Sequence, residues 1–211
     1  MRSFIQGEWA IRAVTGTVFV VVVMGAVYLS IWSNVLLWSF VAVLAWLEWY
    51  RAPSAPAPTW QSWLVGLFPL PALYALIWLG LQDPYDPWPI LVFLWMIWAN
   101  DTGAYVVGKP FGRHKLWVSV SPGKSWEGTI GGALAAGGVA AWTLGLNMLW
   151  LGLLMGGLST SGDLIQSAWK RKRGMKDSGT MLPGHGGIMD RFDGFLLAAP
   201  IYASLWCIFV A

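Results

Sequence analysis

The chain has 211 residues, of which 57% are hydrophobic and only 11% are charged, and its formal net charge is +3. A soluble domain carries roughly a quarter charged residues, so this composition excludes an ordinary water-soluble domain and predicts a protein surrounded by lipid. The single cysteine, Cys207, excludes an intramolecular disulfide framework and a cysteine-rich zinc site. The small net charge gives no reason to expect a nucleic-acid partner.

Long stretches without charged side chains predict membrane-spanning helices, each of which needs about 20 mostly apolar residues. In chain order, the expected helices are 13–31, 34–51, 61–80, 88–107, 129–146, 148–167 and 194–211. We interpret the first as a retained span, because its apolar part is too long for a signal peptide and lacks a clear small-residue cleavage site. The predicted fold class is therefore all-α, a polytopic transmembrane helix bundle of about seven spans.

The basic residues indicate how this bundle is oriented. All 13 of them fall in segments on one side of the predicted membrane: 1–12, 51–60, 108–128 and 168–193. They are Arg2, Arg12, Arg51, Lys109, Arg113, Lys115, Lys124, Lys170, Arg171, Lys172, Arg173, Lys176 and Arg191. Because lysine and arginine concentrate on the cytoplasmic side of membrane proteins, the N-terminus is predicted to be cytoplasmic and the C-terminus outside.

The fourth predicted helix, 88–107, contains an ionisable residue, Asp101. This residue precedes Lys109 by eight positions, which places it about 12 Å deeper along a helix that rises 1.5 Å per residue. A charged group at such a depth is costly and usually faces a cavity or a partner, so Asp101 is a candidate site residue. The alternative is an ion pair with a basic residue that serves packing alone.

The segment before the fifth predicted helix contains Gly123-Lys124-Ser125, which imitates the end of a Walker A loop. That motif also needs a glycine where this chain has Val118 and a preceding strand that the sequence does not predict, so we reject it. Lys124, with the hydroxyls of Ser121 and Ser125, would instead open a helix whose N-terminus favours anions. The alternative is a helix start capped by Ser125, with Lys124 anchored at the lipid headgroups.

Charge and glycine are densest between residues 167 and 193, which we call the signature segment. Asp190 and Asp193 share a face if helical, and they lie beside the N-terminus of the last predicted span, where carboxylates are favoured. Asp163 ends the preceding span on the same side. Three converging carboxylates would suit Mg²⁺, which prefers oxygen ligands and completes its shell with water and substrate phosphates.

Simpler interpretations of the same segment stay open. Asp190 and Asp193 would merely pair with Arg191 or cap a helix, and the four bases at 170–173 would bind acidic lipids. His185 would be a surface histidine, and with His114 as the one other histidine a zinc site is not expected. The glycines around it permit positive φ and close backbone approach, as a phosphate-binding loop requires.

The signature segment resembles the signature of the phosphatidate cytidylyltransferases, also called CDP-diacylglycerol synthases. The matching pattern is Ser167-x-x-Lys170-Arg171, Lys176-Asp177-x-Gly179, Pro183-Gly-His185-Gly-Gly and Asp190-Arg191-x-Asp193. Three further runs are similar to that family: Asp101-Thr102-x-Ala104-Tyr105, Ser121-Pro122-x-Lys124-x-x-Glu127-Gly128 and Gly162-Asp163-Leu164. The resemblance covers about half of the chain, from residue 101 to residue 193.

This resemblance implies a nucleotidyltransferase of phospholipid biosynthesis, which transfers a cytidylyl group from CTP to phosphatidate and gives CDP-diacylglycerol and pyrophosphate. It implies magnesium dependence, with potassium as a candidate second cation, and Asp163, Asp190 and Asp193 as metal ligands. Catalytic roles are expected for Asp163, Lys170, Arg171, Lys176, Asp177, His185, Asp190, Arg191 and Asp193. Substrate-binding roles are expected for Asp101, Ser121, Lys124, Ser125, Glu127, Ser167, Gly186 and Gly187.

Residues 1–100 would then form a lipid-facing scaffold, and residues 101–211 a catalytic membrane region with cytoplasmic loops 108–128 and 168–193. The expected partners are CTP, phosphatidate and membrane lipid, with a homodimer as a candidate assembly. The expected location is the bacterial inner (plasma) membrane, with the active site on its cytoplasmic face.

Three other functions are alternatives. A CTP-dependent polyprenol or phytol kinase is disfavoured by the full signature, and cytidylyl transfer to another lipid phosphate, such as an archaeal ether lipid, stays open. An ion-coupled transporter is disfavoured because the sequence has no repeated pair of broken helices.

Overall fold

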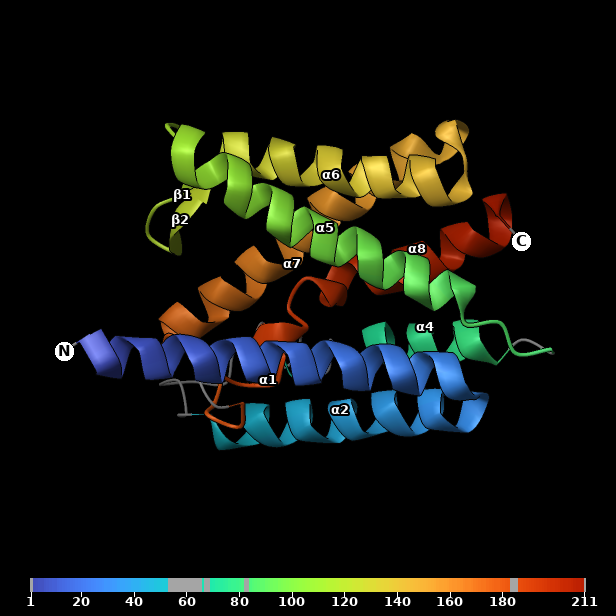
Figure 1. Ribbon diagram of the computed structural model, residues 1–211, viewed down its shortest axis with the longest axis horizontal. Coiled ribbons are helices and arrows are strands. Elements are labelled where there is room, and N and C mark those ends of the chain that lie inside the picture. The colour runs from blue at the N-terminus through green and yellow to red at the C-terminus, as the bar shows by residue number, and fades with distance from the viewer. Residues whose placement is uncertain (1, 53–65, 67–68, 82–83, 183–185, 211) are drawn as a thin grey trace.

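Helices make up most of the molecule (Figure 1). The computed structural model describes residues 2–52, 66, 69–81, 84–182 and 186–210, with side chains described from Val14 onward. Its long helices are α1 (Arg2–Leu29), α2 (Ile31–Arg51), α4 (Pro69–Gly80), α5 (Trp88–Phe111), α6 (Trp126–Leu144), α7 (Leu149–Lys172) and α8 (Phe195–Phe209). Two short 3-10 helices, η1 (Leu146–Met148) and η2 (Met189–Arg191), precede α7 and α8.

The helices lie where the hydropathy pattern predicts them, but several extend beyond the predicted bounds. The first begins at Arg2 and not at residue 13, and the fourth and sixth continue to Phe111 and Lys172. The last turn of α7 contains three basic residues, which the negative end of the helix dipole stabilises, so charge there does not end the helix. Residues 61–65 and 67–68 of the third predicted helix lie outside the described residues.

The apolar helices fit a helical membrane protein. Among the described residues, three helices are long and apolar enough to cross a membrane, namely Ile31–Arg51, Trp88–Phe111 and Leu146–Lys172. Shorter apolar helices cover Val14–Leu29, Leu70–Gly80 and Phe195–Phe209. The number of spans and the orientation in the membrane stay predictions.

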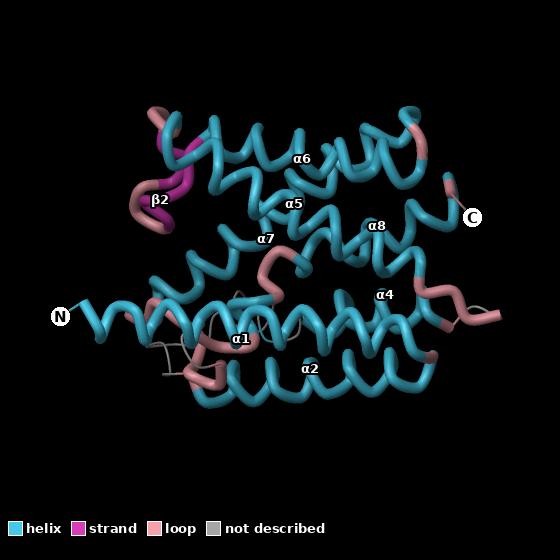
Figure 2. Tube along the Cα trace, viewed as in Figure 1, coloured by secondary structure: helices cyan, strands magenta, loops and turns pink. Residues whose placement is uncertain are grey.

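A small hairpin between α5 and α6 was not predicted. Strands β1 (Lys115–Trp117) and β2 (Ser121–Ser125) pair antiparallel (Figure 2). The expectation that no strand precedes Val118 is therefore wrong. A three-residue strand is too short to produce a recognisable alternation of apolar and polar residues, which explains the error. The Walker A interpretation still fails, because Val118 stands where the motif needs glycine.

Close backbone contact holds α5, α6 and α7 together. A Cβ added at Gly152 of α7 would lie 2.2 Å from the carbonyl oxygen of Ala136 in α6. A Cβ added at Gly132 of α6 would lie 2.6 Å from the carbonyl oxygen of Asn100 in α5. Only glycine permits this spacing, which brings the polar side chains of the three helices within reach of one another.

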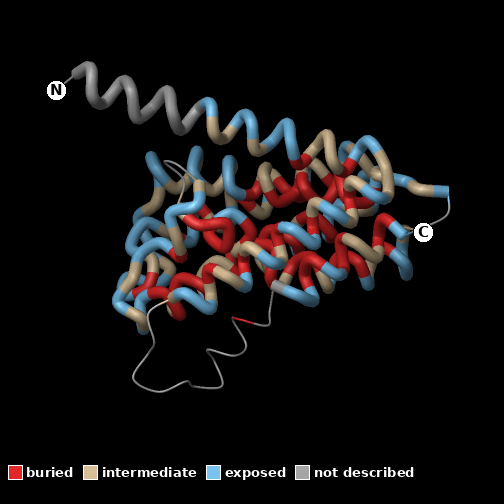
Figure 3. Tube along the Cα trace, turned by 90° about the horizontal axis from the view of Figure 1, so that it is seen from below, coloured by how far each residue is buried: buried red, intermediate tan, exposed pale blue. Residues whose placement is uncertain are grey.

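Aromatic side chains pack the other side of the bundle. The ring centroids of Trp38 in α2 and Phe192 lie 5.8 Å apart, and those of Phe93 in α5 and Phe195 in α8 lie 5.2 Å apart. Tyr202 is fully buried beside Phe93, and its hydroxyl donates to the carbonyl oxygen of Pro89. Figure 3 shows buried positions along the inside of the bundle and exposed positions along its outer faces.

The polar segments gather at one end of the bundle. The N-terminus, the β1–β2 hairpin and the C-terminal ends of α2 and α7 lie at this end, and the C-terminus lies at the opposite end (Figure 1). We call it the hairpin end. It carries described parts of the basic segments that the sequence assigns to the cytoplasmic side.

Candidate active site

A cavity of about 530 Å³ lies among α5, α6 and α7 beside strand β2. Its polar lining comes from these residues: Asn100, Asp101, Tyr105, Lys109, Lys124, Ser125, Thr129, Ser159, Thr160, Asp163 and Asp193. A volume of this size falls within the range of about 300–1,000 Å³ that is typical of small-molecule sites. The cavity therefore has room for part of a nucleotide or a lipid headgroup.

The start of α6 places two side chains at this cavity. Ser125 has an extended backbone, and its Oγ accepts the N–H of Gly128 at 3.2 Å, so the predicted helix cap is confirmed. Lys124 directly precedes the cap, and its Nζ forms an ion pair with Oδ2 of Asp163 on α7. This ion pair disfavours the interpretation of Lys124 as a simple anchor among lipid headgroups.

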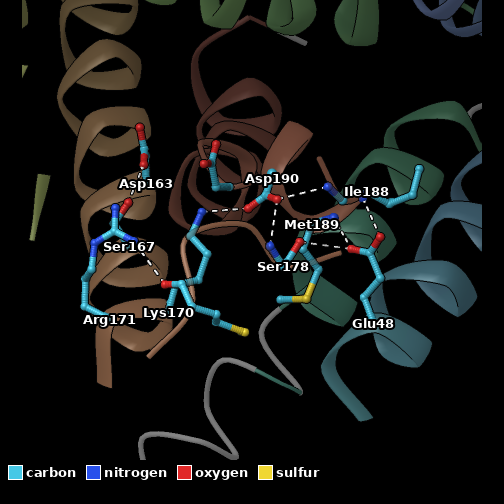
Figure 4. Close-up of polar contacts among 12 residues, drawn as sticks. Glu48, Asp163, Ser167, Lys170, Arg171, Ser178, Ile188, Met189 and Asp190 are labelled. Atoms are coloured by element: carbon cyan, nitrogen blue, oxygen red, sulfur yellow. Dashed lines mark hydrogen bonds and ion pairs between the residues drawn. The ribbon is translucent and has the colours of Figure 1, made fainter. Parts of the chain in front are cut away.

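Helix α7 presents a polar stripe to the same cavity. Ser159 and Thr160 line it one turn before Asp163. Ser167, one turn later, donates from Oγ to Oδ1 of Asp163 at 3.0 Å (Figure 4). Sequence reasoning found Asp163 and Ser167 but missed the two earlier hydroxyls, although spacings of three and four residues put them on the same helix face.

Three carboxylates, those of Asp101, Asp163 and Asp193, face this cavity. Burial raises the pKa of Asp193 well above its usual range, and the negative charge of Asp163 raises it further. Lys170 and Lys124 oppose this rise. Within the described ranges, no group of three or more His, Cys, Asp or Glu side chains is arranged to hold a metal ion. The magnesium site therefore stays a prediction.

Asp190 lies outside the cavity lining, in a buried network. Its Oδ1 accepts a hydrogen bond from Lys170 Nζ at 2.6 Å, and both side chains are less than a tenth exposed. Its Oδ2 accepts the backbone N–H groups of Ser178 at 2.8 Å and Gly187 at 3.0 Å (Figure 4). Burial alone would raise the pKa of Asp190, but the hydrogen bond and charge of Lys170 hold it below its usual value. Both oxygens are thus occupied by partners from the protein.

A buried carboxylate that sequence reasoning missed completes this network. Glu48 comes from the last turn of α2 and is 3% exposed. Its Oε1 accepts the backbone N–H of Ile188 at 2.8 Å. Its Oε2 accepts the N–H of Met189 at 2.9 Å and the Oγ–H of Ser178 at 3.1 Å (Figure 4). In the sequence Glu48 looks like an ordinary charge at a helix end, because its partners lie 130 to 141 positions away.

The remaining predicted residues that the structure describes do not line the cavity. Arg171 ties α7 to the hairpin, since its Nε donates to the carbonyl oxygen of Val120 at 3.2 Å. Glu127 pairs with His114 at 2.6 Å, outside the cavity lining. Lys176, Asp177, Arg191, Ser121 and Gly186 are also absent from that lining. His185 lies outside the described residues.

Comparison with known proteins identifies the family of this chain. A model described as the cytidylyltransferase family matches residues 2–209. The chain therefore belongs to the cytidylyltransferase family, and the resemblance read from the signature segment is confirmed.

Curated relatives show a more specific similarity than the family model does. Proteins named phosphatidate cytidylyltransferase from Staphylococcus saprophyticus, Staphylococcus haemolyticus and Staphylococcus aureus (strain COL) are 40%, 44% and 43% identical to this chain. The alignments extend over 124, 120 and 120 residues, and each covers 53% of this chain and 46% of the relative. The chain thus spans about half the length of the curated relatives that it matches.

Proposed function

We propose that this chain transfers a cytidylyl group from CTP to phosphatidate, giving CDP-diacylglycerol and pyrophosphate. Membership in the cytidylyltransferase family and the names of the staphylococcal relatives support this function. The observation that carries it is a cavity with both basic and acidic side chains inside an apolar helix bundle. A lipid could keep its acyl chains between helices while its phosphate meets a triphosphate in the cavity.

The reaction suits these residues because it requires alignment and charge neutralisation more than proton transfer. An oxygen of the phosphatidate phosphate attacks the α-phosphorus of CTP, the bond from that phosphorus to the oxygen bridging to the β-phosphorus breaks, and pyrophosphate leaves. Phosphatidate is already an anionic nucleophile, so no strong base is needed. Repulsion between the two phosphates is the main obstacle, and positioned donors and cations reduce it.

Lys124 is the cation that we place on a substrate phosphate. In the structure it is paired with Asp163, so binding of a phosphate would exchange one anionic partner for another. Lys109 lines the same cavity, and the hydroxyls of Ser159 and Thr160 supply further donors. These groups would hold the reacting phosphates in place while the carboxylates face a cation.

Asp163 and Asp193 would be the residues that hold magnesium, because this ion commonly binds one or two carboxylates together with substrate phosphates. Bound there, it would neutralise phosphate charge and orient the triphosphate. We leave Asp190 out of the proposed ligand set, because Lys170 and two backbone N–H groups already occupy its oxygens. Asp101 would support the cation from α5, and a role for potassium stays a prediction.

The hairpin end is our proposed cytoplasmic face, and the bacterial inner membrane is the proposed location. The support is the distribution of all 13 basic residues and the bacterial origin of the relatives. A tag fused after Ala211 should report the opposite side of the membrane from a tag at the N-terminus. A homodimer stays a prediction.

The function is tested with the purified chain in detergent, phosphatidate, magnesium and CTP labelled either in the cytosine ring or at the γ-phosphate. We expect the ring label in the extracted lipid and the γ label in pyrophosphate. The γ label in the lipid, without the ring label, would instead identify a kinase. Diacylglycerol and a polyprenol, offered in place of phosphatidate, serve as acceptor controls and should remain unlabelled.

A further inference from the structure

The buried carboxylate of Glu48 joins two parts of the chain that are distant in sequence. It belongs to α2, in the half that the sequence assigns to a scaffold, yet all three of its hydrogen-bond donors lie in the signature segment. Two of the donors are the backbone N–H groups of Ile188 and Met189, at the start of η2. Glu48 therefore fixes the place where η2 begins.

The start of η2 determines where the site carboxylates lie. Asp190 follows Met189 directly, and Asp193, which lines the cavity, is three residues further on. Ser178 connects the two networks, because its hydroxyl donates to Glu48 while its backbone N–H donates to Asp190. A shift of Ile188 and Met189 would thus be passed on to Asp193.

Two glycines of the signature segment leave room for the Glu48 side chain. A Cβ added at Gly179 would lie 2.8 Å from Oε1 of Glu48 and 3.0 Å from its Cδ. A Cβ added at Gly187 would lie 2.2 Å from Oγ of Ser178 and 2.5 Å from Oε2 of Glu48. The segment is therefore shaped around this carboxylate, and the contact is not an incidental touch between a loop and a helix.

We propose that Glu48 is a positioning residue of the candidate active site, which holds Asp193 at the cavity through the start of η2. This inference rests on the proposed function. Glu48 is absent from the cavity lining and acts only through the signature segment. The scaffold helices would therefore contribute to catalysis as well as to membrane anchoring.

Glu48→Gln is the main test, because it keeps the size of the side chain. A carboxylate offers an acceptor oxygen to each side, whereas the amide must turn its NH₂ toward Ile188 or toward Met189 and Ser178. We expect the KM for CTP and the magnesium concentration for half-maximal activity both to rise, with kcat/KM lower by roughly 10- to 100-fold. A smaller folded fraction would lower the maximal rate alone and leave the other two values unchanged.

Asn34→Ala is the matched control on the same helix. Asn34 is fully buried and accepts a hydrogen bond from Trp38 Nε1 at 2.8 Å, about 21 Å along the helix axis from Glu48. This change should lower thermal stability without altering the KM for CTP. If Asn34→Ala and Glu48→Gln shift both kinetic values equally, Glu48 has no positioning role and the inference is overturned.

Rescue between the two sides of the contact provides a second test. Gly179→Ala should impair the wild-type chain, because the new methyl group meets Glu48, but it should impair the shorter Glu48→Asp variant less. Equal losses in both backgrounds would overturn the inference. If the wild-type chain makes no cytidylyl lipid, the proposed function fails and this inference with it; if it does so and Glu48→Gln retains normal KM values, this inference alone fails.

Discussion

Two groups of carboxylates lie within the bundle, and their surroundings differ. Glu48 and Asp190 are buried, and their oxygens accept hydrogen bonds from protein donors. Asp101, Asp163 and Asp193 face a cavity, where Lys124 is paired with Asp163. The first group holds the signature segment in shape, because buried charge is tolerated when it is paired and hydrogen-bonded. The second group lines the cavity and can contact a ligand that binds there.

The sharpest test of this difference is to neutralise one carboxylate of the cavity group. Asp193→Asn should lower kcat/KM by at least about 100-fold, since even outer partners of metal ligands cost 10- to 100-fold. The folded protein should be no less stable, because burial already disfavours the charge of Asp193. The labelled-CTP assay and thermal unfolding in detergent measure the two effects.

The control for this change is Asp86→Asn, a carboxylate-to-amide change in the predicted outer connection. Asp86 accepts the backbone N–H of Trp88 at 2.9 Å, a contact that asparagine can also make. Near-normal turnover in Asp193→Asn would remove Asp193 from the site and end the distinction between the two carboxylate groups.

The opposite result is expected for the buried group. Lys170→Met leaves the Asp190 charge without its main partner, and removing one member of a buried pair typically costs about 3–5 kcal/mol. Thermal unfolding in detergent should show a large loss of stability, in contrast to Asp193→Asn. Replacing both members, as in Lys170→Met/Asp190→Leu, should restore part of it. If Lys170→Met unfolds like the wild type, the pair does not hold the signature segment.

The same pair predicts how stability depends on pH. The pKa of Asp190 is lower in the folded chain than its ordinary value of about 3.9. Its contribution is therefore fully present above that ordinary value and is lost as the pH falls through the lower, folded-state pKa. The unfolding temperature should decline in this acidic range, and Asp190→Asn should show less of that decline. An identical acid profile in both proteins would show that other groups control it.

The two carboxylate groups also differ in how well sequence reasoning found them. Asp101 and Asp163 are charges beside or within apolar segments, and a sequence shows such charges directly because they are costly there. Glu48 could not be found in the same way. Its role depends on contacts with residues 130 to 141 positions away, and no local pattern specifies which loop returns to a helix end.

Local sequence patterns also predicted only part of the fold. Hydropathy located the helices, because lipid requires spanning segments to satisfy their backbone hydrogen bonds internally. It misplaced the end of α7, since basic residues are stable in the last turn of a helix, and it did not predict the hairpin that presents Lys124. The spacing of Asp190 and Asp193 indicates that they share a face, but it does not show that Lys170 pairs with Asp190.

Ser125 combines a structural contact with a place in the cavity lining, and it gives the smallest expected effect. It caps α6 and also lines the cavity. Ser125→Ala should cost about 1 kcal/mol of folding free energy and Ser125→Gly only a few tenths, although both remove the same hydroxyl. If that hydroxyl contacts a substrate, both variants should raise the KM for that substrate by the same small factor. An unchanged KM, with a maximal rate that falls only as far as the folded fraction does, would place Ser125 among the structural residues, because its cap alone would then explain the loss.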